Sequence, residues 1–109
     1  MAESDAQEKI QRLQLMEQNL QQLLAQKQQF QAQVFELDKA LKELKDTSEA
    51  YKIIGNIMVK SDRAELEKDV QQRKELADLR VQTLDKQEKQ IRDKAQSLQK
   101  DVMALLKKE

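Results

Sequence analysis

The sequence predicts a predominantly α-helical fold: a long antiparallel two-helix coiled coil with one β-hairpin at its closed end. Three observations lead to this prediction. Apolar residues recur at heptad spacing in two long stretches, which is the pattern of coiled-coil helices. A short segment rich in β-branched residues, residues 51–60, separates the two stretches. The only glycine of the chain, Gly55, lies inside that segment, and the chain has no proline.

The first helix is expected over about residues 4–46. Its apolar residues alternate three and four apart, as the a and d positions of a heptad do. They are Leu13, Met16, Leu20, Leu23, Phe30, Val34, Leu37, Leu41 and Leu44. Lys27 is the one charged residue in that row. The many glutamines between residues 7 and 33 fill the remaining positions and are interpreted as a solvated helix face.

The hairpin is expected over about residues 50–60, with a two-residue turn in which Gly55 supplies the positive φ of a type II′ turn. In that register Ile54 faces Ile57 and Ile53 faces Met58, so both faces are apolar near the turn. A two-stranded hairpin on its own is marginal in water. We therefore expect this one to be covered or extended, most simply by hairpins of other chains.

The second helix is expected over about residues 62–107, opened by a capping box of Asp62 and Glu65. One seam row is apolar: Val70, Ala77, Leu84, Ile91, Leu98 and Leu105. The other row is mixed: Glu67, Lys74, Val81, Glu88, Ala95 and Val102. The second helix therefore depends on the first for its packing. Aligning the two seams places Leu13 opposite Leu98 and brings Lys27 near Glu88.

Some apolar residues fall off the seam. One group is close in sequence to the hairpin and is expected to cover it or a neighbouring subunit, unless its members are isolated surface residues: Phe35, Leu66, Leu76 and Leu79. A second group is close to the free helix ends: Ile10, Leu15, Met103 and Leu106. There, Val102 and Leu105 face only Lys9 and Ala6, which are not expected to cover them. The ends are thus predicted to show an apolar cluster, interpreted as a binding surface, as fraying ends or as packing between two chains.

Composition excludes several classes of function. The 20 basic and 20 acidic residues cancel, which disfavours a nucleic-acid ligand. The chain has no cysteine and no histidine, so no catalytic residue, metal ligand or cofactor site is assigned, and the protein is interpreted as a non-enzyme. No apolar run reaches the roughly 18 residues that span a membrane. The N-terminus does not resemble a secretory signal. A single cytoplasmic domain over residues 1–109 is expected.

One family resemblance rests on the hairpin motif Tyr51-Lys-x-x-Gly55-x-x-x-Val59-Lys60 between two heptad helices. Together with the later Asp85-Lys-Gln-Glu-Lys-Gln90, it resembles the β class of prefoldin subunits, in its archaeal form. The resemblance covers nearly the whole chain. It implies a hexamer of two α-class and four β-class subunits whose hairpins form β-barrels. It also implies helix tips that hold unfolded proteins and pass them, without ATP, to a group II chaperonin.

The resemblance also implies roles for two sets of residues. The oligomerisation set is Tyr51, Ile53, Ile54, Ile57, Met58 and Val59. The client-binding set is Ile10, Leu13, Met16, Val102, Met103, Leu105 and Leu106. The sequence ends soon after the last of these, at Glu109, which is expected to weaken the tip if relatives depend on a longer tail.

Two other interpretations stay open. A structural scaffold or tether would bind one specific partner through its tips and would not suppress the aggregation of unrelated proteins. A helical chaperone that acts alone, resembling the tubulin cofactors, would be a monomer or dimer and would give the hairpin no role.

Overall fold

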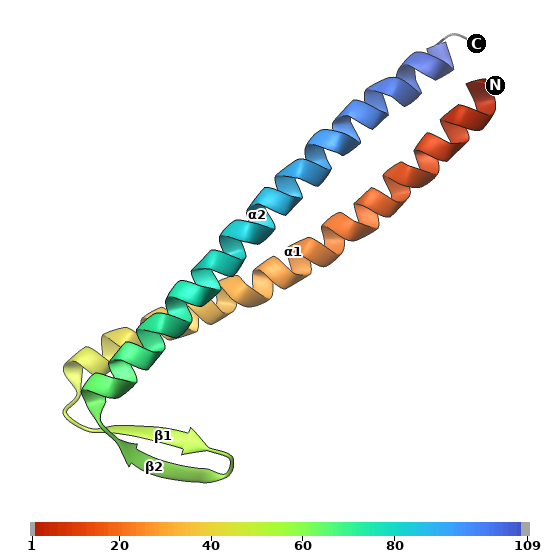
Figure 1. Ribbon diagram of the computed structural model, residues 1–109. Coiled ribbons are helices and arrows are strands. Elements are labelled where there is room, and N and C mark those ends of the chain that lie inside the picture. Colours follow the sequence, from red (N-terminus) through yellow and green to blue (C-terminus); the bar gives the residue numbers. More distant parts are fainter. Residues whose placement is uncertain (1, 108–109) are drawn as a thin grey trace. The chain divides into compact units, whose positions relative to one another are not determined.

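A computed structural model describes residues 2–107 and shows two long helices joined by a β-hairpin (Figure 1). Along the chain the elements are α1 (Ala2–Asp46), β1 (Ala50–Ile54), β2 (Ile57–Ser61) and α2 (Arg63–Lys107). This arrangement confirms the predicted fold class. Helix α1 begins two residues earlier than expected, and β2 continues to Ser61.

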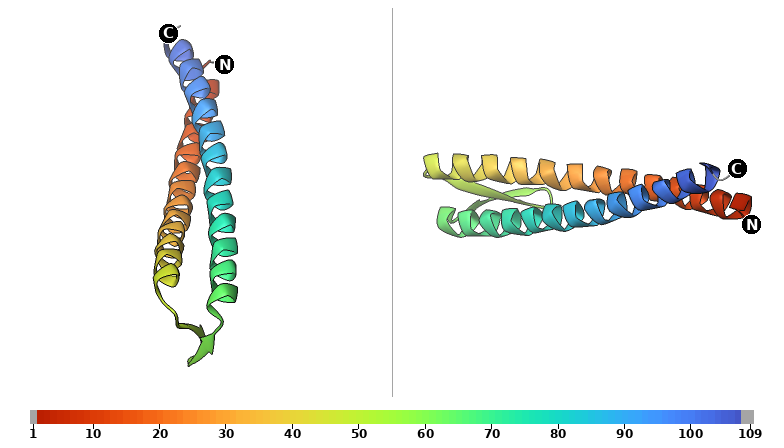
Figure 2. Two further views of the ribbon diagram at one scale, coloured as in Figure 1. Left: turned by 90° about the vertical axis from the view of Figure 1, so that its left-hand side faces the viewer. Right: turned by 90° about the horizontal axis from the view of Figure 1, so that it is seen from above.

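The chain divides into two compact units, and both helices contribute to each. One unit combines the residues up to 27 with those from 82 onward, and the other comprises residues 28–81. In both units α1 and α2 run antiparallel (Figure 2). The expectation of a single domain over residues 1–109 stays a prediction.

The predicted seam is the side of each helix that is covered. Every seam position of α1 from Leu13 to Leu44, and every seam position of α2 from Glu67 to Leu105, is half-buried or buried. The buried residues of the described chain are few: Ala6, Leu41, Leu44, Ala50, Ala77, Leu84 and Val102. The core is therefore a narrow stripe, as expected for two helices that pack only against each other.

Short polar contacts hold the helix ends next to the hairpin. The Arg63 guanidinium donates hydrogen bonds to the backbone carbonyls of Leu44 and, at 2.9 Å, of Lys45. These carbonyls lie in the last turn of α1, where helical partners are missing, so Arg63 supplies partners from the start of α2. Asp62 is the N-cap of α2, because its side chain accepts a bond from the Ala64 amide at 3.4 Å.

The hairpin has the predicted register and turn. Ile54 pairs with Ile57, and Ile53 pairs with Met58. Gly55 has a φ of +59°, whereas no described non-glycine residue has a positive φ. A positive φ at the first turn position alone defines a type II′ turn, whose twist matches that of the strands. The pairing of all five residues of each strand follows from this turn.

Candidate functional site

The hairpin exposes a concentrated set of apolar side chains. We call Tyr51, Ile53, Ile54, Ile57, Met58 and Val59 the hairpin surface. All six are exposed, from 44% for Val59 to 68% for Ile53. Large apolar side chains gathered on one short element, rather than scattered singly, are typical of an interaction surface.

Both faces of the hairpin take part in this surface. On one face Ile54 lies opposite Ile57, and Lys52 lies opposite Val59. The other face carries Tyr51, Ile53, Met58 and Lys60 in two cross-strand pairs. Each face thus combines an apolar group with one lysine. Within residues 2–107 the sheet has two strands, so each strand also has an unpaired edge.

The face with Tyr51 borders a groove within the unit of residues 28–81. Tyr51 and Ile53 line it on the hairpin side, and Leu44, Leu66 and Val70 line it on the helix side. The Tyr51 hydroxyl donates a hydrogen bond of 3.2 Å to the Glu49 carboxylate, which fixes the ring at the start of β1.

The off-seam residues near the hairpin behave differently from one another. Leu66 is half-buried in the groove beside the hairpin, as expected. Phe35, Leu76 and Leu79 are 72%, 60% and 58% exposed. Within this chain they do not cover the hairpin, so that part of the expectation was wrong. A side chain at the outward heptad positions that these three occupy points away from the seam.

The ends of the two helices expose a smaller apolar surface. We call Ile10, Leu13, Met16, Val102, Met103, Leu105 and Leu106 the helix-end surface. Ile10, Met103 and Leu106 are exposed by 38%, 54% and 51%. Leu13, Met16 and Leu105 are seam residues and are half-buried. The off-seam Leu15, on α1, is 60% exposed and adds to the apolar character of this region.

Val102 contradicts the expectation that it would be uncovered. Only 7% of it is exposed, and Ala6 of α1 is also buried. Alanine is small, so the helix backbones can approach closely at this level. The Lys9 ammonium lies 3.9 Å from the Asp101 carboxylate at the same end of the helices. The expectation that Lys9 and Ala6 leave Val102 uncovered is therefore wrong.

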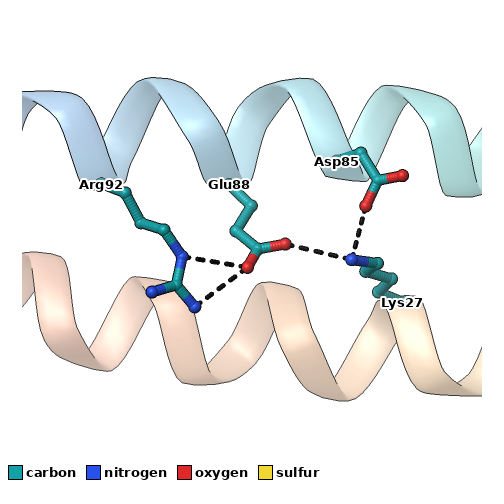
Figure 3. A network of polar contacts seen from close by, with 4 residues as sticks. All are labelled: Lys27, Asp85, Glu88 and Arg92. Atoms are coloured by element: carbon teal, nitrogen blue, oxygen red, sulfur yellow. Dashed lines mark hydrogen bonds and ion pairs between the residues drawn. The ribbon is translucent and has the colours of Figure 1, made fainter.

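An ionic network lies in the seam of the unit that contains the helix ends (Figure 3). Lys27 of α1 contacts Asp85 at 2.5 Å and Glu88 at 3.2 Å, both on α2. Arg92 holds the other oxygen of Glu88 at 3.0 Å. The predicted proximity of Lys27 and Glu88 is confirmed.

This network shifts two pKa values away from their ordinary range. The hydrogen bonds that the Lys27 ammonium donates, first to Asp85 and then to Glu88, raise the pKa of Lys27. Hydrogen bonds from Lys27 and then Arg92 lower the pKa of Glu88. Both shifts favour the charged forms, so each partner stabilises the ionised state of the other.

A second seam lysine was not foreseen as an ion-pair partner. Lys74 of α2 contacts Asp38 of α1 at 3.0 Å, and this bond lowers the pKa of Asp38. The sequence could have indicated this pair. In two antiparallel helices, residues at the same level have residue numbers with a constant sum. The sum for Lys74 and Asp38 is almost the same as the sum for Leu13 and Leu98, which were aligned in the sequence analysis.

The described residues form neither a candidate metal site nor a helix suited to span a membrane. Within residues 2–107, no three acidic side chains come together in a way that could hold a metal ion. In the same part of the chain, neither helix is long and apolar enough to cross a membrane. The described features that suit binding are the hairpin surface and the helix-end surface.

Comparison with known proteins gives a consistent result. A family model described as prefoldin subunit matches residues 7–109. The prefoldin subunit beta of Caldivirga maquilingensis is 38% identical over 100 residues, which cover 89% of this chain and 83% of the relative. The prefoldin subunit beta of Sulfurisphaera tokodaii is 36% identical over 107 residues, covering 95% of this chain and 86% of the relative.

A solved structure is also similar. The crystal structure of the prefoldin beta subunit from Thermococcus strain KS-1 matches with a TM-score of 0.87 and 26% sequence identity. The match covers 91% of this chain and 90% of that one. The similarity thus extends through both helices and the hairpin between them.

Proposed function

The chain belongs to the prefoldin subunit family, and on that premise we propose that it is a β-class subunit of an ATP-independent chaperone that holds unfolded proteins. The observation that carries the proposal is the hairpin surface, whose six apolar side chains are all exposed. Such a hairpin is unstable in water unless other chains cover it. A subunit of a larger assembly meets that requirement, whereas a protein that acts alone does not.

The proposed assembly contains two α-class prefoldin subunits and four copies of this chain. Hairpins joining edge to edge would pair the free strand edges and bury the hairpin surface. Each of the six side chains is about half exposed, so burying it contributes ~1 kcal/mol, half of the value for full burial. This burial favours assembly without any contribution from the helix ends.

The helix-end surface is proposed to bind clients. Ile10, Met103 and Leu106 offer flexible apolar side chains that can fit varied sequences. Three exposed residues bind weakly, so several subunits would hold one unfolded chain by multivalency and release it without nucleotide. Delivery to a group II chaperonin in the cytoplasm completes the proposed function. It requires no cofactor and no enzymatic step.

A tether that binds one specific partner is the second candidate. One observation favours it: the burial of Val102 leaves the helix-end surface less apolar than the sequence suggested. A small apolar patch suits a single complementary partner. The two candidates differ in whether unrelated unfolded proteins are protected from aggregation.

The test combines a helix-end variant with native mass measurement. We expect Ile10→Ser with Met103→Ser and Leu106→Ser to leave the complex of about six chains intact, because none of these residues lies in the hairpin. Suppression of aggregation of two unrelated unfolded proteins should fall about three- to tenfold, since weak contacts multiply across subunits. The matched control replaces three exposed polar residues nearby, Gln14, Gln96 and Gln99, by serine.

The outcomes separate the candidates. Equal suppression by the variant and the control would remove the helix ends from client binding. If the native complex protects neither protein, the tether is favoured. A native mass of one or two chains would contradict the assembly itself.

A further inference from the structure

Two lysines occupy positions in the seam where apolar residues are usual. Lys27 lies in the seam row of α1, and Lys74 lies in that of α2. Their side chains are only 22% and 26% exposed. Each reaches across to acidic residues of the other helix, and the two contacts lie in different compact units. From these contacts we propose that the two lysines and their carboxylate partners set the register in which α1 and α2 pair.

The two contacts report the same register independently. In an antiparallel helix pair, residues at one level have numbers with a constant sum. The numbers of Lys27 and Asp85 add up to 112, and so do those of Lys74 and Asp38. Two ion pairs in separate units are therefore satisfied together in one alignment of the helices.

The apolar seam alone discriminates poorly between alignments. One row of α2 repeats an apolar residue every seven positions, through Leu84, Ile91 and Leu98. Sliding α2 past α1 by seven residues therefore replaces one apolar contact by another. A heptad repeat without distinguishing residues permits such slips, and a polar seam residue is the known way to exclude them.

The charges oppose one slip in full and the other in part. With one helix moved by seven residues in one sense, Lys27 comes level with Arg92, and Lys74 comes level with Lys45. This slip exchanges attractive contacts for like-charge contacts, which are unfavourable. Moved in the opposite sense, Lys27 comes level with Asp78 and keeps an acidic partner, but Lys74 comes level with Gln31 and loses its own. In that slip Glu88 also comes level with Glu17, a like-charge contact.

Stability is not the main gain from these pairs. A partly buried ion pair is often no more stabilising than apolar residues of similar size, because both charges lose water. The short connections to the hairpin also restrain the alignment, and both helices run unbroken through both units, so a slip has to displace these connections as well. The contacts of Lys27 add a second restraint in the unit that contains the helix ends. Apolar replacements there should leave the pair as stable as before but less well aligned.

The experiment reads the register by disulfide cross-linking. The chain has no cysteine, so introduced pairs react alone. Leu20→Cys with Ile91→Cys reports the observed alignment. Leu20→Cys with Leu84→Cys, or with Leu98→Cys, reports the two slipped alignments. Each pair is introduced into the full chain, and the fraction oxidised within one chain is measured.

Three backgrounds are compared: the native seam, Lys27→Leu with Glu88→Leu, and Asp69→Leu with Arg73→Leu. The last pair removes an ion pair of 3.4 Å within α2 while adding the same two leucines. We expect slipped cross-links to rise about 10-fold in the first variant and to stay at the native level in the control. The Tm of the first variant should be unchanged or higher.

Slipped cross-links that stay rare in the first variant, or that rise equally in the control, would overturn the proposal. If the double variant loses its helical circular dichroism, Lys27→Met alone gives the same comparison, because Arg92 still contacts Glu88. The measurement concerns helix pairing alone, so its result does not depend on whether the helix ends hold clients.

Discussion

The hairpin and the helical seam both consist largely of apolar residues, but only the seam is covered within one chain. The seam positions of both helices are half-buried or buried, whereas the six residues of the hairpin surface are all exposed. The helix pair can therefore form without other subunits, while the hairpin surface would be covered only in the proposed assembly. The difference indicates where variants should act: in the seam on the folding of the chain, and in the hairpin on its assembly.

The largest effect is expected from introducing charged residues into the hairpin surface. Ile54→Asp with Ile57→Asp places two carboxylates opposite each other on one face. We expect complete loss of the multi-subunit complex, measured by native mass spectrometry, because these charges would be buried without partners. The helical circular dichroism should persist, since the seam is untouched. The control variant, Ser48→Asp with Asn56→Asp, adds the same charge outside the strands. A complex of normal mass from the Ile54 and Ile57 variant would contradict the role of the hairpin in assembly.

A smaller effect is expected at two neighbouring residues of α2. Val102 is 7% exposed and Met103 is 54% exposed. Val102→Ala should lower the free energy of unfolding by about 1–2 kcal/mol, because it removes buried methyl groups. Met103→Ala should change it by less than about 0.5 kcal/mol. Thermal or urea unfolding measures both. Equal losses would mean that Val102 is not part of the seam, whereas neither variant should change the mass of the complex.

The smallest effect concerns pH and Glu88. The pKa of Glu88 is lowered in the folded chain by Lys27 and Arg92, so its stabilising contribution is present at neutral pH. That contribution is lost as the pH falls from the ordinary value of 4.5 through the lowered one. Glu88→Gln should therefore reduce the drop in Tm between pH 6 and pH 3 by about 2 °C, as expected for a solvent-screened pair. An unchanged pH profile would show that the Lys27 network adds nothing to folding.

Much of this fold was predictable because its determinants are local. Heptad spacing identified both seams, and Gly55 identified the turn and hence the strand register. The exposure of Ile10, Met103 and Leu106 followed from their positions outside the seam. In each case the residue type and its spacing were sufficient, and no contact between distant residues had to be known.

The contacts that were not predicted depend on how far individual side chains extend, which the spacing of residues in the sequence does not reveal. Val102 is buried together with Ala6, although a small alanine was not expected to cover it. The hydrogen bonds from Arg63 to the end of α1 join residues that lie 18 and 19 positions apart. Arg63 lies one heptad before Val70 in the seam row, but helix periodicity does not reveal that its side chain bonds to backbone carbonyls of the other helix.

The contacts between α1 and α2 also differ in how much chain lies between the partners. Arg63 and Leu44 are separated by 19 positions, Lys74 and Asp38 by 36, and Lys27 and Glu88 by 61. Closing a longer loop costs more conformational entropy. Once a contact that closes a shorter loop has formed, the additional entropy lost in forming the next contact is small. We therefore expect the chain to fold as a zipper, beginning with the hairpin and the helix turns next to it. The helix termini, which pair last and open first, would then exchange with solvent fastest in the native protein.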